Sequence, residues 1–154
     1  MITIGLSGYD YDDWRGNFYP ERLPRKQWLG YYARHFPALE LNFSYYRLPN
    51  PGQLASMVER TDGRVEFAIK AHRSMTHERV ASDNDYTVFL EAVAELRQAG
   101  RLAAVLAQFP YSFRQCEENR RYLKRLAERL GSPLVVELRR VDWAEDPIVQ
   151  WLEK

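Results

Sequence analysis

The chain has 154 residues, a length that allows one sizeable hydrophobic core and predicts a single domain over residues 1–154. Its 22 Lys and Arg residues nearly balance its 21 Asp and Glu residues, so the formal net charge of +1 excludes a global field that would attract nucleic acid or anionic lipid. One cysteine, no apolar run near the roughly 20 residues that span a bilayer, and no signal-peptide pattern at the start together predict a cytoplasmic protein with no membrane segment and no internal disulfide.

The first part of the chain predicts two strand-then-helix units. Residues 2–6 form a short apolar, β-branched run typical of a strand, and the loop after it extends to Pro20. Apolar residues then recur at helical spacing between residues 28 and 36. Residues 38–43 are strand-like again, and Asn50-Pro51 places a cap residue before a proline, which is the expected opening of a second helix.

The middle of the chain repeats this pattern. Residues 65–71 predict a third strand, and Ser82 with Asp85 resembles the cap of a helix that ends at Gly100. Residues 102–109 are continuously apolar, as is typical of a parallel strand covered on both faces.

The last part of the chain predicts a fifth strand between two helices. Ser112 to Gln115 has the spacing of a capping box before a helix that Gly131 closes. Residues 133–138 predict the strand, and Asp146-Pro147 is expected to open a helix that continues to the last residue.

Five β-α units in series imply an α/β protein with a parallel sheet and right-handed crossovers, either an open sheet or part of a (β/α)8 barrel. A complete barrel typically needs about 250 residues. We therefore predict an incomplete TIM (β/α)8-type barrel of about five parallel β-α repeats, in which roughly the last three units are absent.

Short motifs spread along the chain carry a family resemblance. They are Ser7-Gly8-Tyr9, Trp14-Arg15-Gly16, Phe18-Tyr19-Pro20, Glu40-Leu41-Asn42, Lys70 with Thr76-His77, Gln108-Phe109-Pro110, and Glu137-Leu138-Arg139 with Trp143. In this collinear order they resemble the domain of unknown function 72 (YecE-like) family, of which the chain is similar to the N-terminal part. The resemblance implies a fold of the TIM-barrel type, and it implies no particular reaction because the family has no established activity.

Polar residues at the ends of the predicted strands define a candidate site. Ligands of parallel α/β proteins lie beyond the carboxyl ends of the strands, and side chains two positions apart share one face. Our hypothesis takes Glu40, Lys70 and Glu137 as catalytic, with either glutamate as the acid/base group. Ligand-binding roles go to Lys70 and Arg139, which would hold an anionic group, and to Asn42 and Gln108, which would orient the ligand. The alternative is that Lys70 and Glu137 form a buried ion pair that closes the end of the barrel.

Three further residues are candidates for ligand binding. His77 lies in the loop after the third strand, where it could bind a ligand or cap the loop. Tyr9 and Trp14 belong to an aromatic first loop that could stack on a ligand or fold over the barrel mouth. Glu40, His77 and Glu137 could in principle bind a metal, but no metal-binding spacing supports such a site, so neither a metal nor a cofactor is predicted.

The leading functional hypothesis is a TIM-barrel protein that binds a small polar or anionic ligand. If the protein is an enzyme, the hypothesis assigns it hydrolase or isomerase activity. The first alternative is a nucleic-acid or nucleotide-binding module that uses the aromatic loop and Arg139, which the balanced charge does not favour. The second is a non-catalytic truncated remnant. A homodimer that covers the open edges of the sheet is the expected protein partner.

Overall fold

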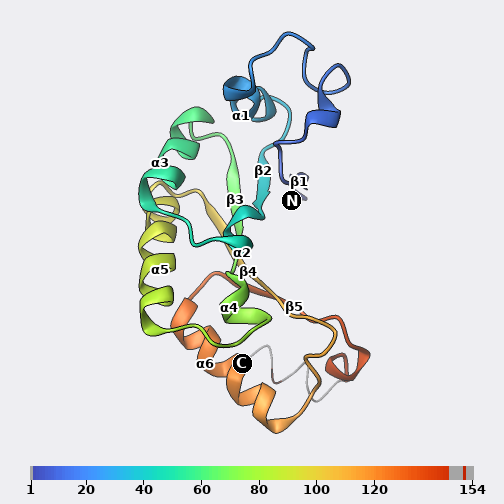
Figure 1. Ribbon diagram of the computed structural model, residues 1–154, viewed down its shortest axis with the longest axis vertical. Helices are drawn as coiled ribbons and strands as arrows, with labels where there is room; N and C mark the ends of the chain where they lie inside the picture. The colour runs from blue at the N-terminus through green and yellow to red at the C-terminus, as the bar shows by residue number, and fades with distance from the viewer. Residues whose placement is uncertain (1, 146–150, 152–154) are drawn as a thin grey trace.

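The computed structural model describes residues 2–145 and Trp151, which form an elongated, curved molecule (Figure 1). The helix expected to open at Asp146-Pro147 therefore lies, apart from Trp151, outside the described residues. Within the part that is described, no helix has the length and apolar character needed to cross a bilayer.

A single sheet of five parallel strands runs through the molecule in sequence order. Each strand pairs only with its predecessor and successor, so both ends of the sheet are open edges among the described residues. This arrangement confirms the predicted α/β class with five parallel β-α units. The strands are β1 (Gly5–Ser7), β2 (Ala38–Leu41), β3 (Glu66–Lys70), β4 (Leu102–Gln108) and β5 (Leu134–Glu137).

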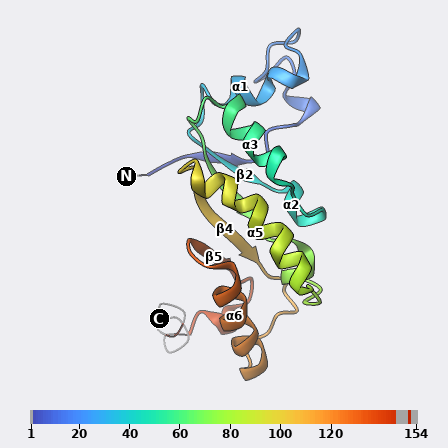
Figure 2. The ribbon, with the colours of Figure 1, turned by 90° about the vertical axis from the view of Figure 1, so that its left-hand side faces the viewer.

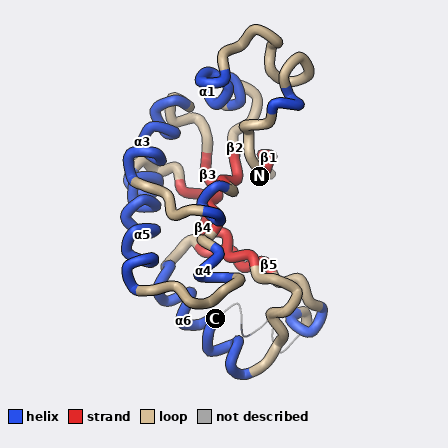
Figure 3. Tube along the Cα trace, viewed as in Figure 1, coloured by secondary structure: helices blue, strands red, loops and turns tan. Residues whose placement is uncertain are grey.

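Four helices connect successive strands, and the longer ones line one face of the sheet (Figures 1 and 3). In Figure 2 the helices α3, α5 and α6 lie in front of the strands. The connecting helices are α1 (Trp28–Tyr32), α3 (Pro51–Arg60), α5 (Asp83–Gln98) and α6 (Glu117–Leu130). Short helical segments that the sequence patterns did not predict are α2 (Phe43–Tyr46), α4 (Arg73–Thr76), η1 (Asp12–Trp14), η2 (Arg25–Gln27) and η3 (Val141–Trp143).

Of the four predicted helix openings, two are confirmed and the one at Asp146-Pro147 lies outside the described residues. The side chain of Asn50 accepts a hydrogen bond from the backbone N–H of Gln53. Ser82 and Asp85 form the reciprocal capping box at the start of α5. Each cap satisfies backbone donors that the first turn of a helix leaves without a partner.

The capping box predicted at Ser112 to Gln115 is wrong, because α6 begins at Glu117 with no side-chain cap. The preceding residues form a turn in which Phe113 N–H donates to the carbonyl of Pro110. The buried Phe113 ring stacks on Phe109 and Trp143, and its carbonyl accepts from the indole of Trp143. Tertiary packing thus holds this segment out of the helix.

Strand β1 begins at Gly5, three residues after the start of the strand predicted at residues 2–6. Ile2 and Ile4 are 91% and 67% exposed. At the start of the β1–β2 pair, the hydroxyl of Tyr32 accepts from Leu6 N–H at 2.9 Å and donates to the Ala38 carbonyl at 2.7 Å. A side-chain hydroxyl therefore bridges the two strands where a direct backbone bond would otherwise form.

The two faces of the sheet differ in character because strand side chains alternate in direction. Phe67, Ile69, Val105 and Ala107 point toward the helices and are fully buried. The intervening positions form the opposite, open face and include alanines together with the polar residues of the candidate site.

Candidate functional site

Three neighbouring strands place a chain of polar side chains on the open face. Lys70 at the end of β3 donates a hydrogen bond to the side-chain carbonyl of Gln108 on β4. The amide nitrogen of Gln108 donates to Glu137 on β5, with which Gln108 is in register. The guanidinium of Arg139 lies 3.4 Å from the same carboxylate oxygen of Glu137. Four of the predicted site residues are therefore continuous in space.

Gln108 separates the two charged groups that the ion-pair alternative would join. Lys70 and Glu137 each contact this amide, and the described residues include no salt bridge between them. A neutral amide thus bonds to a cation through its oxygen and to an anion through its nitrogen. Its orientation is fixed by the different chemistry of the two partners.

A second polar group joins β1 to β2. Ser7 donates to the carboxylate of Glu40 at 2.8 Å, and Asn42 donates to the hydroxyl of Ser7. Glu40 pairs in register with Ser7 on one side and Ala68 on the other. Ala68 is two residues before Lys70 on the same face of β3, so both polar groups occupy the open face near the carboxyl ends of the strands.

Tyr45 links His77 to the first of these groups. The Tyr45 ring lies 5.2 Å from the Lys70 ammonium and 4.9 Å from the His77 ring. His77 ends α4 and contacts Thr76 through its Nδ1 atom at 3.1 Å. Sequence reasoning missed Tyr45 because the four-residue helix that positions it has no periodic pattern.

The electrostatic surroundings of His77 are positive. Burial lowers the pKa of His77 below its usual value, and the nearby charges of Lys70 and Arg139 lower it further, against a smaller opposite effect of Glu78. Lys70 and Arg139 therefore act on the same region even though Lys70 ends β3 and Arg139 lies two residues after the end of β5.

The two aromatic candidates lie in a separate cluster. The Trp14 ring packs at 5.0–6.0 Å against Tyr11, Phe18 and Tyr19. Tyr9 is positioned by its carbonyl, which accepts from the Tyr19 hydroxyl at 2.6 Å. Burial raises the pKa of the Tyr9 phenol, while the Arg60 guanidinium beside it acts in the opposite direction. Among the described residues, neither candidate hydrogen-bonds to the polar groups of the open face.

The candidate metal ligands are not clustered in space. Within residues 2–145 and Trp151, no group of three or more His, Cys, Asp or Glu side chains is arranged to hold a metal ion. Glu40 and Glu137 belong to different polar groups, and His77 contacts Tyr45 and Thr76.

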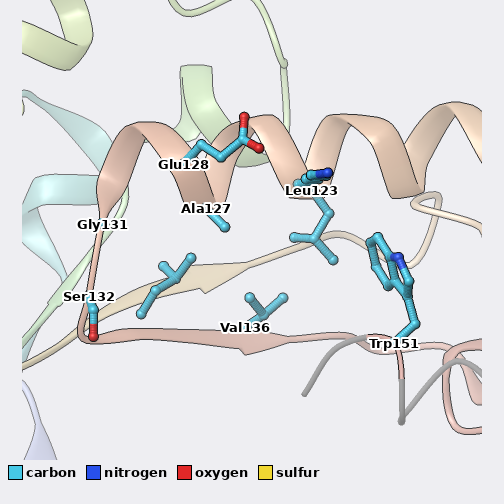
Figure 4. A pocket seen from close by; sticks show the side chains of 9 residues that line it. Leu123, Ala127, Glu128, Gly131, Ser132, Val136 and Trp151 are labelled. Carbon is cyan, nitrogen blue, oxygen red and sulfur yellow. The ribbon is translucent and has the colours of Figure 1, made fainter. Parts of the chain in front are cut away.

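A hollow adjoins the Glu40 end of the open face. It has a volume of about 310 Å³ and is lined mostly by glycine, alanine and leucine, with Ser7, Glu40 and Glu66 as its polar members. A larger hollow of about 750 Å³ lies between α6 and β5 (Figure 4), where Leu123, Ala127, Val136 and Trp151 form its apolar wall. That second hollow is on the helix-facing side, so it is not part of the polar site.

Comparisons with known proteins identify the family of the chain. The family model described as "Protein of unknown function DUF72" matches residues 3–154. The chain belongs to this family. The family resemblance stated from the sequence motifs is thereby confirmed.

Relatives of this DUF72 protein are considerably longer. The UPF0759 protein YunF of Bacillus subtilis (strain 168) is 29% identical over 157 residues, which cover 97% of this chain and 55% of YunF. The crystal structure of a DUF72 family protein from Thermotoga maritima MSB8 has a TM-score of 0.85 and 34% identity, covering 99% of this chain and 61% of that one. A DUF72 family protein from Enterococcus faecalis V583 has a TM-score of 0.80 and 27% identity, covering 99% and 56%. The chain thus spans little more than half the length of these relatives.

Proposed function

We propose that the open face of the sheet binds a small anionic ligand beside Lys70. The observation that carries this proposal is the hydrogen-bonded chain from Lys70 through Gln108 to Glu137 and Arg139. An ammonium group has three N–H donors, and Gln108 accepts from Lys70 on only one side of it. The remaining donors of Lys70, with the Arg139 guanidinium nearby, are suited to a carboxylate or phosphate.

The same arrangement is suited to acid/base chemistry of the hydrolase or isomerase type. Glu137 lies next to the proposed anion site, and Glu40 lies on the same face one strand from Lys70. Either carboxylate would exchange a proton with a ligand held by Lys70, while Asn42 and Gln108 would orient it. His77 and Tyr45 would line the same end of the site, next to Lys70.

A titration with a simple anion tests the binding step. We expect hexanoate, followed by NMR chemical-shift changes, to bind the wild-type chain and to lose most of its affinity for Lys70→Ala. Glu137→Gln should change the affinity as well, because it alters the charge next to Arg139. The matched control is Lys124→Ala, which removes an exposed lysine of α6. Wild-type affinity in Lys70→Ala would contradict the proposal, and no binding at all would favour a non-catalytic protein.

Nucleic acid is not the proposed ligand. The rings of Trp14, Phe18 and Tyr19 pack on one another, which supports the role of folding the first loop rather than stacking on bases. A cytoplasmic location is the setting proposed for the chain, since the thiol of Cys116 is free and exposed.

A second copy of the chain is the proposed protein partner. The support is the pair of open edges at β1 and β5, because an edge strand presents backbone N–H and C=O groups that another strand can pair with. The exposed Ile2 and Ile4 extend the β1 edge with apolar surface.

A further inference from the structure

Charge is distributed unevenly along the open face of the sheet. At one end, Lys70 and Arg139 lie close enough to act together on His77. Lys70 forms no salt bridge with any described carboxylate, and its nearest polar partner is the neutral amide of Gln108. Arg139 is paired with Glu137, so Lys70, Arg139 and Glu137 together give this end two positive charges against one negative charge, and it is positive overall.

The opposite end carries negative charge next to empty space. Glu40 and Glu66 both line the hollow of about 310 Å³ at β1–β3, and neither has a salt-bridge partner among the described residues. The hollow is also lined by Gly5, Ala38, Ala68 and Ala103, whose small size leaves room for a ligand. Ser7 holds one oxygen of the Glu40 carboxylate, which leaves its other oxygen free to accept.

The strand register determines how far apart these two ends lie. Glu40 pairs with Ala68, and Lys70 follows Ala68 by two residues on the same face. With neighbouring strands about 4.8 Å apart and a rise of about 3.3 Å per residue, the Cα atoms of Glu40 and Lys70 are separated by about 8 Å. Both side chains rise from the same face, so one small molecule can reach both.

We infer that the natural ligand is a small zwitterion, with an acidic group at Lys70 and an ammonium group at Glu40. This inference rests on the proposed anion site. A simple anion would occupy only the positive end and would leave the hollow and its carboxylates without a partner. An ammonium group offers three N–H donors to the free oxygen of Glu40, and its charge is opposite to that of the hollow. Ligands in which the two charges are separated by several bonds fit this spacing better than ligands in which they share one carbon.

Matched pairs of small molecules test this inference. 6-Aminohexanoate and hexanoate have the same carbon chain and carboxylate, and they differ only in the terminal ammonium group. We expect 6-aminohexanoate to bind the wild-type chain about threefold to tenfold more tightly, as a partly exposed charge pair allows. 4-Aminobutyrate, whose charges are closer together, should show a smaller advantage over butyrate.

Two variants assign the effect to the two ends of the face. Glu40→Gln retains an acceptor for Ser7 and removes the charge, so it should abolish the preference for 6-aminohexanoate while hexanoate still binds at Lys70, no more weakly than to the wild type. Lys70→Ala should weaken both molecules. Glu91→Gln, on the exposed side of α5, is the matched control and should behave as the wild type.

The outcomes separate the two proposals. Equal affinity for 6-aminohexanoate and hexanoate, with both dependent on Lys70, would overturn the zwitterion and leave the anion site standing. A preference for 6-aminohexanoate that survives Glu40→Gln would also overturn it. If neither molecule binds, both the anion site and the zwitterion are refuted.

Discussion

The side-chain amide of Gln108 donates a hydrogen bond to the carboxylate of Glu137, a residue 29 positions later in the chain. The contact follows from the β4–β5 register, which places these two residues side by side at the carboxyl ends of their strands. Because the other end of the amide accepts from Lys70, one neutral side chain fixes a cation and an anion on opposite sides of itself. The order of the strands thereby determines the order of the charges along the carboxyl ends of the strands.

Replacing this central amide should destabilise the protein. Gln108→Ala removes one hydrogen bond from Lys70 and one from Glu137, and we expect the free energy of unfolding to fall by about 1–3 kcal/mol, since each bond involves a charged partner. Urea denaturation measures the change. Gln98→Ala at the exposed end of α5 is the control. Equal stability of Gln108→Ala and wild type would show that water replaces the amide at no cost.

The Tyr32 hydroxyl is expected to stabilise the β1–β2 pair. Tyr32→Phe leaves Leu6 N–H and the Ala38 carbonyl without their present partner, so we expect a loss of about 1–2 kcal/mol in unfolding free energy. Thermal denaturation of Tyr32→Phe and of Tyr46→Phe, a tyrosine that is 72% exposed, makes the comparison. If Tyr32→Phe and Tyr46→Phe both have the melting temperature of the wild type, β1 and β2 must move together and form the backbone hydrogen bond directly.

Association through an open edge predicts a concentration-dependent mass. Sedimentation velocity of the wild-type chain should show dimers that dissociate on dilution. Ile4→Lys places a charge beside the β1 edge and should weaken association, as edge lysines commonly do. Val80→Lys alters a similarly exposed valine in the loop after α4 and should not. A monomer at every concentration would contradict the proposed partner.

The sequence predicts the strands and the polar positions of this fold because both depend on local patterns. Strand-like runs place Glu40, Lys70 and Glu137 toward strand ends, alternation predicts which side chains share a face, and serial β-α units imply a parallel sheet. The contact between Lys70 and Gln108 cannot be predicted from these patterns alone. It depends on the length of the two side chains and on the irregular β3–β4 register, which together determine which neighbours meet.

Sequence patterns do not predict features that depend on packing between distant segments. The Tyr32 bridge forms between a helix and two strands, and Tyr45 reaches Lys70 from a single helical turn. At Phe113, stacking between Phe109 and Trp143 overrides the capping-box spacing. In each case a long-range contact competes with, or replaces, the local preference.

His77 gives the site a pH dependence whose sign follows from its surroundings. Because burial, Lys70 and Arg139 lower the pKa of His77 in the folded chain, the unfolded chain binds the proton more readily. Folding stability attributable to His77 is therefore fully present above the ordinary histidine pKa of about 6.5 and is lost as pH falls below it.

We accordingly expect the unfolding free energy of the wild type to decrease more steeply between about pH 7 and pH 5 than that of His77→Gln, which cannot take up the proton. Urea denaturation across this range measures the difference. In Lys70→Ala the wild-type slope should become shallower, because one of the two charges opposing protonation is removed. Parallel pH profiles for wild type and His77→Gln would show that Lys70 and Arg139 do not act on this ring, and the positive end of the face would lose its independent support.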